Sequence, residues 1–216
     1  MTKSLTTLIA NVQALLLDDG TRFSTATVTA AVRSALKEIN QRAPVNAGTL
    51  IDTVADQKDY ELTDSIDAAD AISIIDILEW DSSGDDHTSL VYDEYNEDER
   101  LFFRLRSAQP ASGFILARFT IPYTVSGLDS ATESTIPAFY DDILIDGACF
   151  YSCQIRSVGR IEPINLNKDV TKSLLDAKIY FRQAFDIGLT LMAKKKPQVS
   201  EPSTAAWNDQ YHAWDQ

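Results

Sequence analysis

The 216-residue sequence has few of the residues that metal sites and acid–base catalysis require. It contains two cysteines and two histidines, and the histidines, His87 and His212, lie in separate polar segments. Cys149 and Cys153 are four positions apart, so they share one face of a predicted helix without the further ligands that a zinc site needs. We therefore expect two buried free thiols, no metal site and no oriented histidine base.

The short motifs of common enzyme classes are also missing. The sequence has no glycine-rich phosphate loop, no Gly-x-Ser-x-Gly elbow and no His-Glu-x-x-His pair. Asp141 and Asp142 are adjacent on a predicted helix, so they cannot face each other as an acid and a base, and we interpret them as charges at a helix start. The sequence predicts a protein that is not an enzyme and that binds no cofactor.

Basic residues are scarce relative to acidic ones, with 19 Lys and Arg against 32 Asp and Glu and a formal net charge of −13. This balance disfavours a groove that grips nucleic-acid phosphates, although DNA can slide past an acidic surface without adhering. No apolar run approaches the ~20 residues that cross a bilayer, and the N-terminus lacks a signal-peptide pattern. We expect a soluble, intracellular product with no membrane association.

Helical periodicity is the strongest pattern that the sequence does contain. Residues 137–158 are apolar around most of the helix circumference, so we expect this helix to be central and surrounded by the other elements. Further helices are predicted at 4–19, 24–42 and 167–195, where Ser24 suits an N-cap and Pro44 ends the second helix. The four segments together predict two helical hairpins.

Between the second and third predicted helices the hydrophobic period changes to two. Residues 71–80 are rich in β-branched side chains, residues 101–106 alternate strictly, and residues 113–123 continue the pattern. The sequence therefore predicts an α+β fold that is mainly a helical bundle, with two helical hairpins around a buried central helix and a small antiparallel sheet inserted at about 49–123. We expect a body of residues 1–196 and a flexible, extended C-terminal tail of residues 197–216.

An acidic segment lies between the predicted strands at 71–80 and 101–106. Its carboxylates could in principle bind Ca²⁺ or Mg²⁺, but their spacing fits no EF-hand, so we interpret the segment as a solvated acidic loop. These residues are Asp85, Asp86, Asp93, Glu94, Glu97, Asp98 and Glu99.

The predicted tail is small, polar and proline-containing, yet it includes three large aromatic residues. Trp207, Tyr211 and Trp214 are spaced so that one face of a short helix would hold all three, and aromatic residues are favoured as interface anchors. They could fold back on the body or dock on a partner, and a flexible linker before them favours docking.

The order of the segments resembles a known family. The stretches RFSTATVTAAVRSALKEINQRAP, DYELTDSIDAADAISIIDILEW and PASGFILARFTIPYTVSGLDSATESTIPAFYDDILIDGACFYSC closely follow the plan of head-to-tail adaptor proteins of tailed bacteriophages, over roughly Thr21 to Lys196. The resemblance implies a structural virion protein of the neck, made in the host cytoplasm. Such a protein forms a ring of identical subunits, twelve by analogy, beneath the portal, completes the head and connects it to the tail.

The resemblance also implies partners for the candidate residues. The expected partners are further copies of the chain, the portal protein, a downstream stopper or tail protein, and genomic DNA that passes through the lumen without specific contacts. We hypothesise that residues of the acidic set face the lumen or its rim, and that Trp207, Tyr211 and Trp214 dock on the portal. Two alternatives stay open: another neck or tail-completion (stopper) protein, and a metal-assisted hydrolase that uses the acidic segment.

Overall fold

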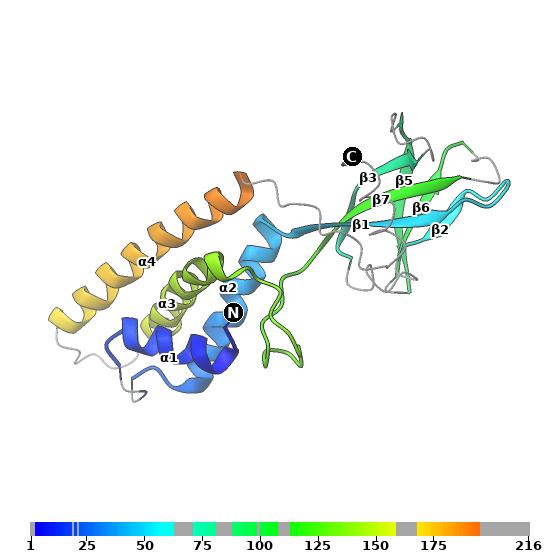
Figure 1. Cartoon of the computed structure of the whole chain (residues 1–216). Helices are drawn as coiled ribbons and strands as arrows, with labels where there is room; N and C mark the ends of the chain where they lie inside the picture. Colours follow the sequence, from blue (N-terminus) through cyan, green and yellow to red (C-terminus); the bar gives the residue numbers. More distant parts are fainter. Residues whose placement is uncertain are drawn as a thin grey trace, which may run out of the picture. The chain divides into compact units, whose positions relative to one another are not determined.

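The structure is a computed structural model that describes residues 3–18, 20, 22–62, 71–80, 88–98, 100–107, 113–158 and 168–194. The chain divides into two compact units. The helical unit comprises residues 1–43 and 123–196, and the sheet unit comprises residues 44–122. Each unit is described below by itself (Figure 1).

Four α-helices build the described part of the helical unit: α1 (Leu5–Leu15), α2 (Thr25–Arg42), α3 (Asp141–Val158) and α4 (Lys168–Lys194). The side chains of Ser4 and Ser24 accept hydrogen bonds from the backbone N–H groups of Thr7 and Thr27, at 3.5 and 3.3 Å, and so cap α1 and α2. The 3₁₀ turn η2 (Ala138–Tyr140) precedes α3, so the helix predicted from residue 137 begins with a tighter turn. No described helix has both the length and the apolar character needed to span a membrane.

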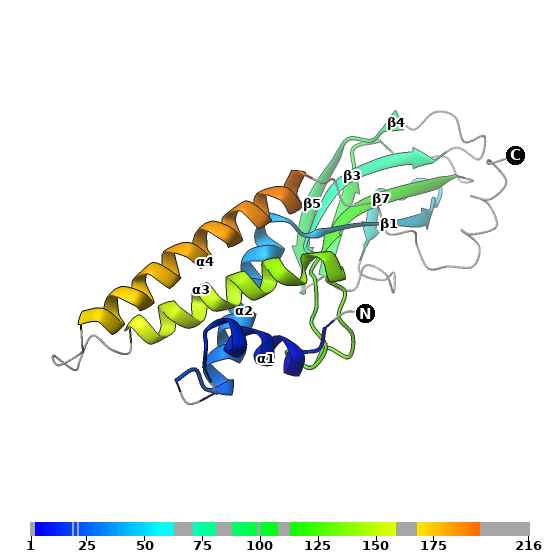
Figure 2. The same cartoon turned by 60° about the vertical axis from the view of Figure 1, so that its left-hand side comes forward.

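Helix α3 packs against α1, α2 and α4. It lies between α1 and α4 in both Figure 1 and Figure 2. Its side chains Leu144, Ala148, Cys149 and Cys153 are fully or almost fully buried, because neighbouring helices cover most of its circumference. Phe139 in η2, just before the N-terminus of α3, stays largely exposed, so neighbouring elements do not cover this apolar side chain.

Seven strands build the described part of the sheet unit, in two antiparallel sheets. The first sheet has the order β1-β7-β3-β4 and the second has the order β2-β6-β5. The bounds are β1 (Val45–Asp52), β2 (Asp59–Glu61), β3 (Ser73–Trp80), β4 (Thr88–Ser89), β5 (Tyr92–Glu97), β6 (Arg100–Leu105) and β7 (Phe114–Ile121).

The inner faces of the two sheets share one hydrophobic core. Strand β7 contributes Ile115, Ala117 and Phe119, and strand β6 contributes Leu101, Phe103 and Leu105, all at most 2% exposed. Tyr60 of β2 stacks on Phe103 with ring centroids 5.4 Å apart. The strict alternation of β6 in the sequence therefore corresponds to one buried and one outward face.

The prediction of a mainly helical bundle with a small inserted sheet is wrong. Strand β1 begins at Val45, directly after the stop at Pro44, and pairs without interruption with β7 from Val45↔Ile121 to Asp52↔Phe114. The seven described strands form a compact unit with a core of their own, so the strands are not a minor interruption of a helical fold. The sequence underestimated them because β1, with Asn46, Gly48 and Thr49, lacks a strong apolar alternation.

The acidic segment likewise contains strands instead of forming a loop throughout. Thr88–Ser89 and Tyr92–Glu97 are β4 and β5, and β5 pairs with β6 along its whole length. An edge strand with side chains in solvent needs backbone hydrogen bonds but no apolar period, so polar β5 gives no clear strand signal in the sequence.

Candidate interaction surface

Two glycines let α4 approach α3 closely. A Cβ atom at Gly147 of α3 would lie 2.7 Å from the ring of Phe185 and 2.9 Å from Ala35, and a Cβ at Gly188 of α4 would lie 2.7 Å from Ile143. Each helix thus offers a gap to a large side chain of the other. This reciprocal contact fixes how far apart the two helices lie.

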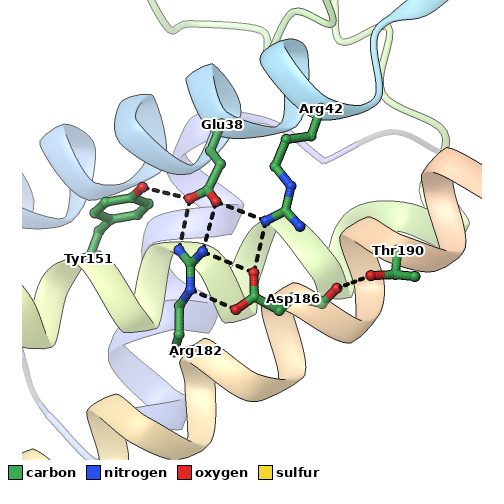
Figure 3. A network of polar contacts seen from close by, with 6 residues as sticks. All are labelled: Glu38, Arg42, Tyr151, Arg182, Asp186 and Thr190. Atoms are coloured by element: carbon green, nitrogen blue, oxygen red, sulfur yellow. Dashed lines mark hydrogen bonds and ion pairs between the residues drawn. The ribbon is translucent and has the colours of Figure 1, made fainter.

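A polar network fixes the rotation of α4 about its axis (Figure 3). Arg182 of α4 donates two hydrogen bonds of 3.0 Å to Glu38 of α2, and two more of 2.8 and 2.9 Å to Asp186. Arg42 donates to Glu38 at 3.1 Å and to Asp186 at 2.8 Å. Tyr151 of α3 donates its hydroxyl to Glu38 at 2.7 Å. Three helices therefore meet in one network whose two guanidinium groups balance two carboxylates.

The network holds Glu38 in its charged form. Burial raises the pKa of this carboxyl, but the hydrogen bonds from Arg182, Tyr151 and Arg42 outweigh burial, so the pKa lies below its usual range. Burial and the bond to Glu38 raise the pKa of Tyr151 to about 12, so this phenol stays a donor at neutral pH. The side chain of Glu38 is 15% exposed, which leaves the carboxylate dependent on its protein partners.

With its rotation fixed, α4 leaves five large apolar side chains exposed among its described residues; Leu175 and Ile179 lie on the side of Arg182, and the other three form a separate line. Tyr180, Ile187 and Leu191 are 65%, 63% and 55% exposed. At about 100° per residue, the three lie within about 40° of one another and on the side of α4 away from Arg182 and Asp186. We call this set the outer strip. Solvent-exposed helix faces are normally polar, so an apolar line of this kind marks a contact surface.

A second exposed apolar feature lies where α1 ends. Leu15 is 52% exposed and Leu17 is 90% exposed, and Leu17 has a φ of 50°, a left-handed conformation that costs a leucine free energy. We call Leu15 and Leu17 the α1 end. Asp18 stabilises the turn, because its carboxylate accepts hydrogen bonds from the backbone N–H groups of Arg22 at 3.0 Å and Phe23 at 2.6 Å.

Neither the network nor the outer strip was predicted from the sequence. The usable signal was the spacing of four between Glu38 and Arg42 and between Arg182 and Asp186, which favours ion pairs within a helix. Sequence spacing cannot show that the two pairs lie side by side, since they are 144 positions apart.

The residues predicted as an acidic site are only partly described. Asp93 and Glu97 lie opposite Arg104 and Arg100 of β6, on the outward face of the sheet, whereas Glu94 lies opposite the buried Phe103. Asp93 accepts a hydrogen bond from Arg106 at 3.1 Å, and Glu94 accepts one from the backbone N–H of Ile74 at 3.0 Å. The described carboxylates therefore divide between the two faces of β5.

The remaining members of that set are placed as follows. Asp98 lies in the turn between β5 and β6 with a φ of 50°. Asp85, Asp86 and Glu99, and the predicted docking residues Trp207, Tyr211 and Trp214, lie outside the described residues. Their assignment to a lumen or to a portal contact stays a prediction.

Cys149 and Cys153 are free and buried, as predicted. Burial raises the pKa of both thiols, that of Cys153 to about 11, which keeps them protonated and unreactive at neutral pH. Within the described ranges, no group of three His, Cys, Asp or Glu residues is arranged to hold a metal ion.

Most of the net negative charge of the chain is concentrated in residues 44–122. Residues 44–122, the sheet unit, have 5 Lys and Arg against 17 Asp and Glu, a formal charge of −12. Residues 1–43 and 123–196, the helical unit, have 14 Lys and Arg against 12 Asp and Glu, a formal charge of +2. Electrostatic repulsion between copies therefore opposes contacts between sheet units far more than contacts between helical units.

No protein-family model matches the sequence, and a search of curated proteins found no match.

Proposed function

We propose that this protein is a structural subunit of the neck of a tailed bacteriophage. In this role, copies of the chain form a ring under the portal that completes the head and connects it to the tail, with DNA passing through the lumen. The proposal starts from the resemblance in segment order. The observation that supports it best is the apolar surface on both sides of α3, at the α1 end and on the outer strip of α4.

Apolar surfaces on different sides of one protomer suit a head-to-tail assembly. A contact that joins two different surfaces of identical copies produces a ring when the rotation closes, whereas a two-fold contact uses the same surface twice. Large exposed apolar side chains are also unfavourable on a protein that works alone. The helical unit therefore has the features expected of a ring subunit.

The charge distribution agrees with passage of DNA. The excess of carboxylates is concentrated in residues 44–122, so one unit of each subunit can give the lumen a negative surface along which DNA does not adhere. The C-terminal residues Trp207, Tyr211 and Trp214 are the proposed portal anchors, and a ring would present many such anchors at once, which raises the apparent affinity.

The decisive experiment measures the mass of the purified full chain with and without purified portal protein, by native mass spectrometry or mass photometry. We expect a defined ring on the portal, and we expect deletion of residues 200–216 to abolish portal binding while the far-UV circular dichroism of the remaining chain is unchanged. Binding to a different neck component in place of the portal would favour the stopper alternative. Failure to bind any neck component would contradict the proposal.

A further inference from the structure

We infer that copies of this chain associate head to tail through the helical unit, with the α1 end of one copy docked on the outer strip of α4 of the next. The inference rests on the proposed function only for the closure of such contacts into a ring. The contact itself is argued from exposed apolar area, charge and the separate positions of the two surfaces.

The two surfaces belong to different sides of the helical unit. Helices α1 and α4 lie on opposite sides of α3 in Figure 1 and Figure 2, so a protomer cannot join its own α1 end to its own outer strip. When two copies associate, the contact uses the α1 end of one copy and the outer strip of the other, which leaves the second surface of each copy free. Successive copies would then add in the same orientation.

The area is large enough for a specific contact. If a fully exposed large side chain presents about 200 Å², the outer strip and the α1 end together present roughly 650 Å² of apolar surface. An interface of ordinary size, ~1,600 Å² in total and ~57% apolar, buries about 900 Å² of apolar surface. The five side chains alone supply most of that area, and polar neighbours at the rim add the rest.

Charge favours this pairing over a parallel contact between two outer strips. The α1 end is followed by Asp18 and Asp19, while helix α1 itself has no charged residue. The outer strip ends beside the exposed Lys194, which Lys195 and Lys196 follow in the sequence. Docking the α1 end on the C-terminal part of the strip brings Asp18 near Lys194, whereas parallel packing of two strips would bring the Lys194 side chains of both copies together.

The test uses full-length variants with aspartate placed on each surface. Leu17→Asp alters only the α1 end, and Asp tolerates the left-handed conformation at this position. Ile187→Asp alters only the outer strip. The control is Val91→Asp in the sheet unit, because Val91 is 61% exposed and Ile187 is 63% exposed. Circular dichroism and the melting temperature establish that each variant is folded before assembly is measured by sedimentation velocity over a range of concentrations.

We expect the wild-type protein and V91D to assemble with rising concentration, and L17D and I187D each to assemble at least tenfold more weakly. A mixture of L17D and I187D restores one contact, between the intact α1 end of I187D and the intact strip of L17D, so it should give 1:1 pairs and no larger species. Wild-type assembly should persist at raised ionic strength, because salt screens interactions between exposed charges while the apolar contact remains.

Three results would overturn the inference. These are a wild-type chain that stays monomeric at all concentrations, normal assembly of I187D, and normal assembly of L17D, which would point to a two-fold contact between strips. The outcome is separable from that of the portal experiment. If the wild type, L17D and I187D all form rings on the portal equally well, the proposed function stands and the contact is refuted. Head-to-tail assembly without binding to the portal or another neck component would support the contact and contradict the proposed function.

Discussion

The helical unit and the sheet unit differ in where their charged side chains lie. In the helical unit, Glu38, Arg42, Arg182 and Asp186 form one partly buried network that joins α2 to α4, with Tyr151 of α3 as a further donor. In the sheet unit, exposed Arg side chains pair with carboxylates of adjacent strands, as Arg104 does with Asp59 at 2.7 Å. Ion pairs in solvent contribute little to stability, whereas partly buried ones depend on every member.

This difference bears on association as well as on stability. The sheet unit has a formal charge of −12 and the helical unit one of +2, so the helical unit is the part that can approach another copy without strong repulsion. The same unit holds the outer strip and the α1 end. Five predictions test the contrast between the units, from the largest expected effect to the smallest.

The largest effect is expected in the core of the sheet unit. Phe103 is fully buried and stacks on Tyr60, so Phe103→Ala leaves a cavity and should destabilise the sheet unit by about 3–5 kcal/mol. Calorimetry should show a lower transition for the sheet unit, while the helical circular dichroism at 222 nm persists to the wild-type temperature. A single transition that shifts as a whole would show that the two units unfold together.

A smaller effect is expected at the contact between α3 and α4. Gly147→Ala places a methyl group 2.7 Å from the ring of Phe185, and the resulting overpacking should cost the helical unit about 1–3 kcal/mol, measured by urea denaturation at 222 nm. Gly113→Ala in the sheet unit is the matched control, since its added Cβ would meet Thr53 at an ordinary distance of 3.4 Å. Equal effects of the two substitutions would contradict the close approach.

The polar network should contribute somewhat less. Glu38→Gln keeps the shape of the side chain but removes the charge that Arg182 and Arg42 require, and we expect a loss of about 1–2 kcal/mol in the helical unit. Arg33→Gln, which breaks the exposed pair between Arg33 and Asp129, is the control within the same unit and should leave the unfolding midpoint unchanged. A wild-type midpoint for E38Q would show that the network does not stabilise the helical unit.

The same network predicts how stability depends on pH. The pKa of Glu38 is lower in the folded chain than in the unfolded chain, so its contribution is fully present above the unfolded value, about 4.3, and is lost as the pH falls through the folded value. The stability difference between wild type and E38Q, measured in urea from neutral to acidic pH, should be constant near pH 7 and shrink below about pH 4.3. Asp186 shifts in the same direction, but it is present in both proteins.

The smallest effect is expected at the exposed ion pairs of the sheet unit. Arg104 donates to both carboxylate oxygens of Asp59, at 2.7 and 2.9 Å, but both side chains are well exposed to solvent. Arg104→Gln should therefore leave the sheet-unit transition within experimental error of wild type. A loss as large as that of E38Q would mean that the two units do not differ in the way their ion pairs act.

Parts of the fold were predictable because they depend on local patterns. All four predicted helices occur, although α1 ends at Leu15 and not at residue 19, since apolar periodicity and caps such as Ser24 are properties of short segments. The buried face of β6 followed from its strict alternation. The balance between helices and strands was predicted wrongly, because β1 and β5 are held by backbone pairing to β7 and β6 and have no clear apolar period of their own.

The candidate surface was not predictable for a related reason. Neither the helix predicted at 4–19 nor the helix predicted at 167–195 indicated which of its apolar side chains would stay exposed. Which apolar side chains stay exposed depends on how many neighbours each helix has, and α4 is covered chiefly by α3. A pattern in the sequence shows that a face is apolar, but it does not show what covers that face.

The sequence by itself determined the helices, their caps, the buried thiols and the scarcity of positive charge, because each depends on residue type and short-range spacing. Only the tertiary structure decided that the strands form a unit with its own core, that the acidic charge is concentrated there, and that Glu38 meets Arg182. These features join residues that are up to 144 positions apart, and only the packing of distant elements brings such residues together.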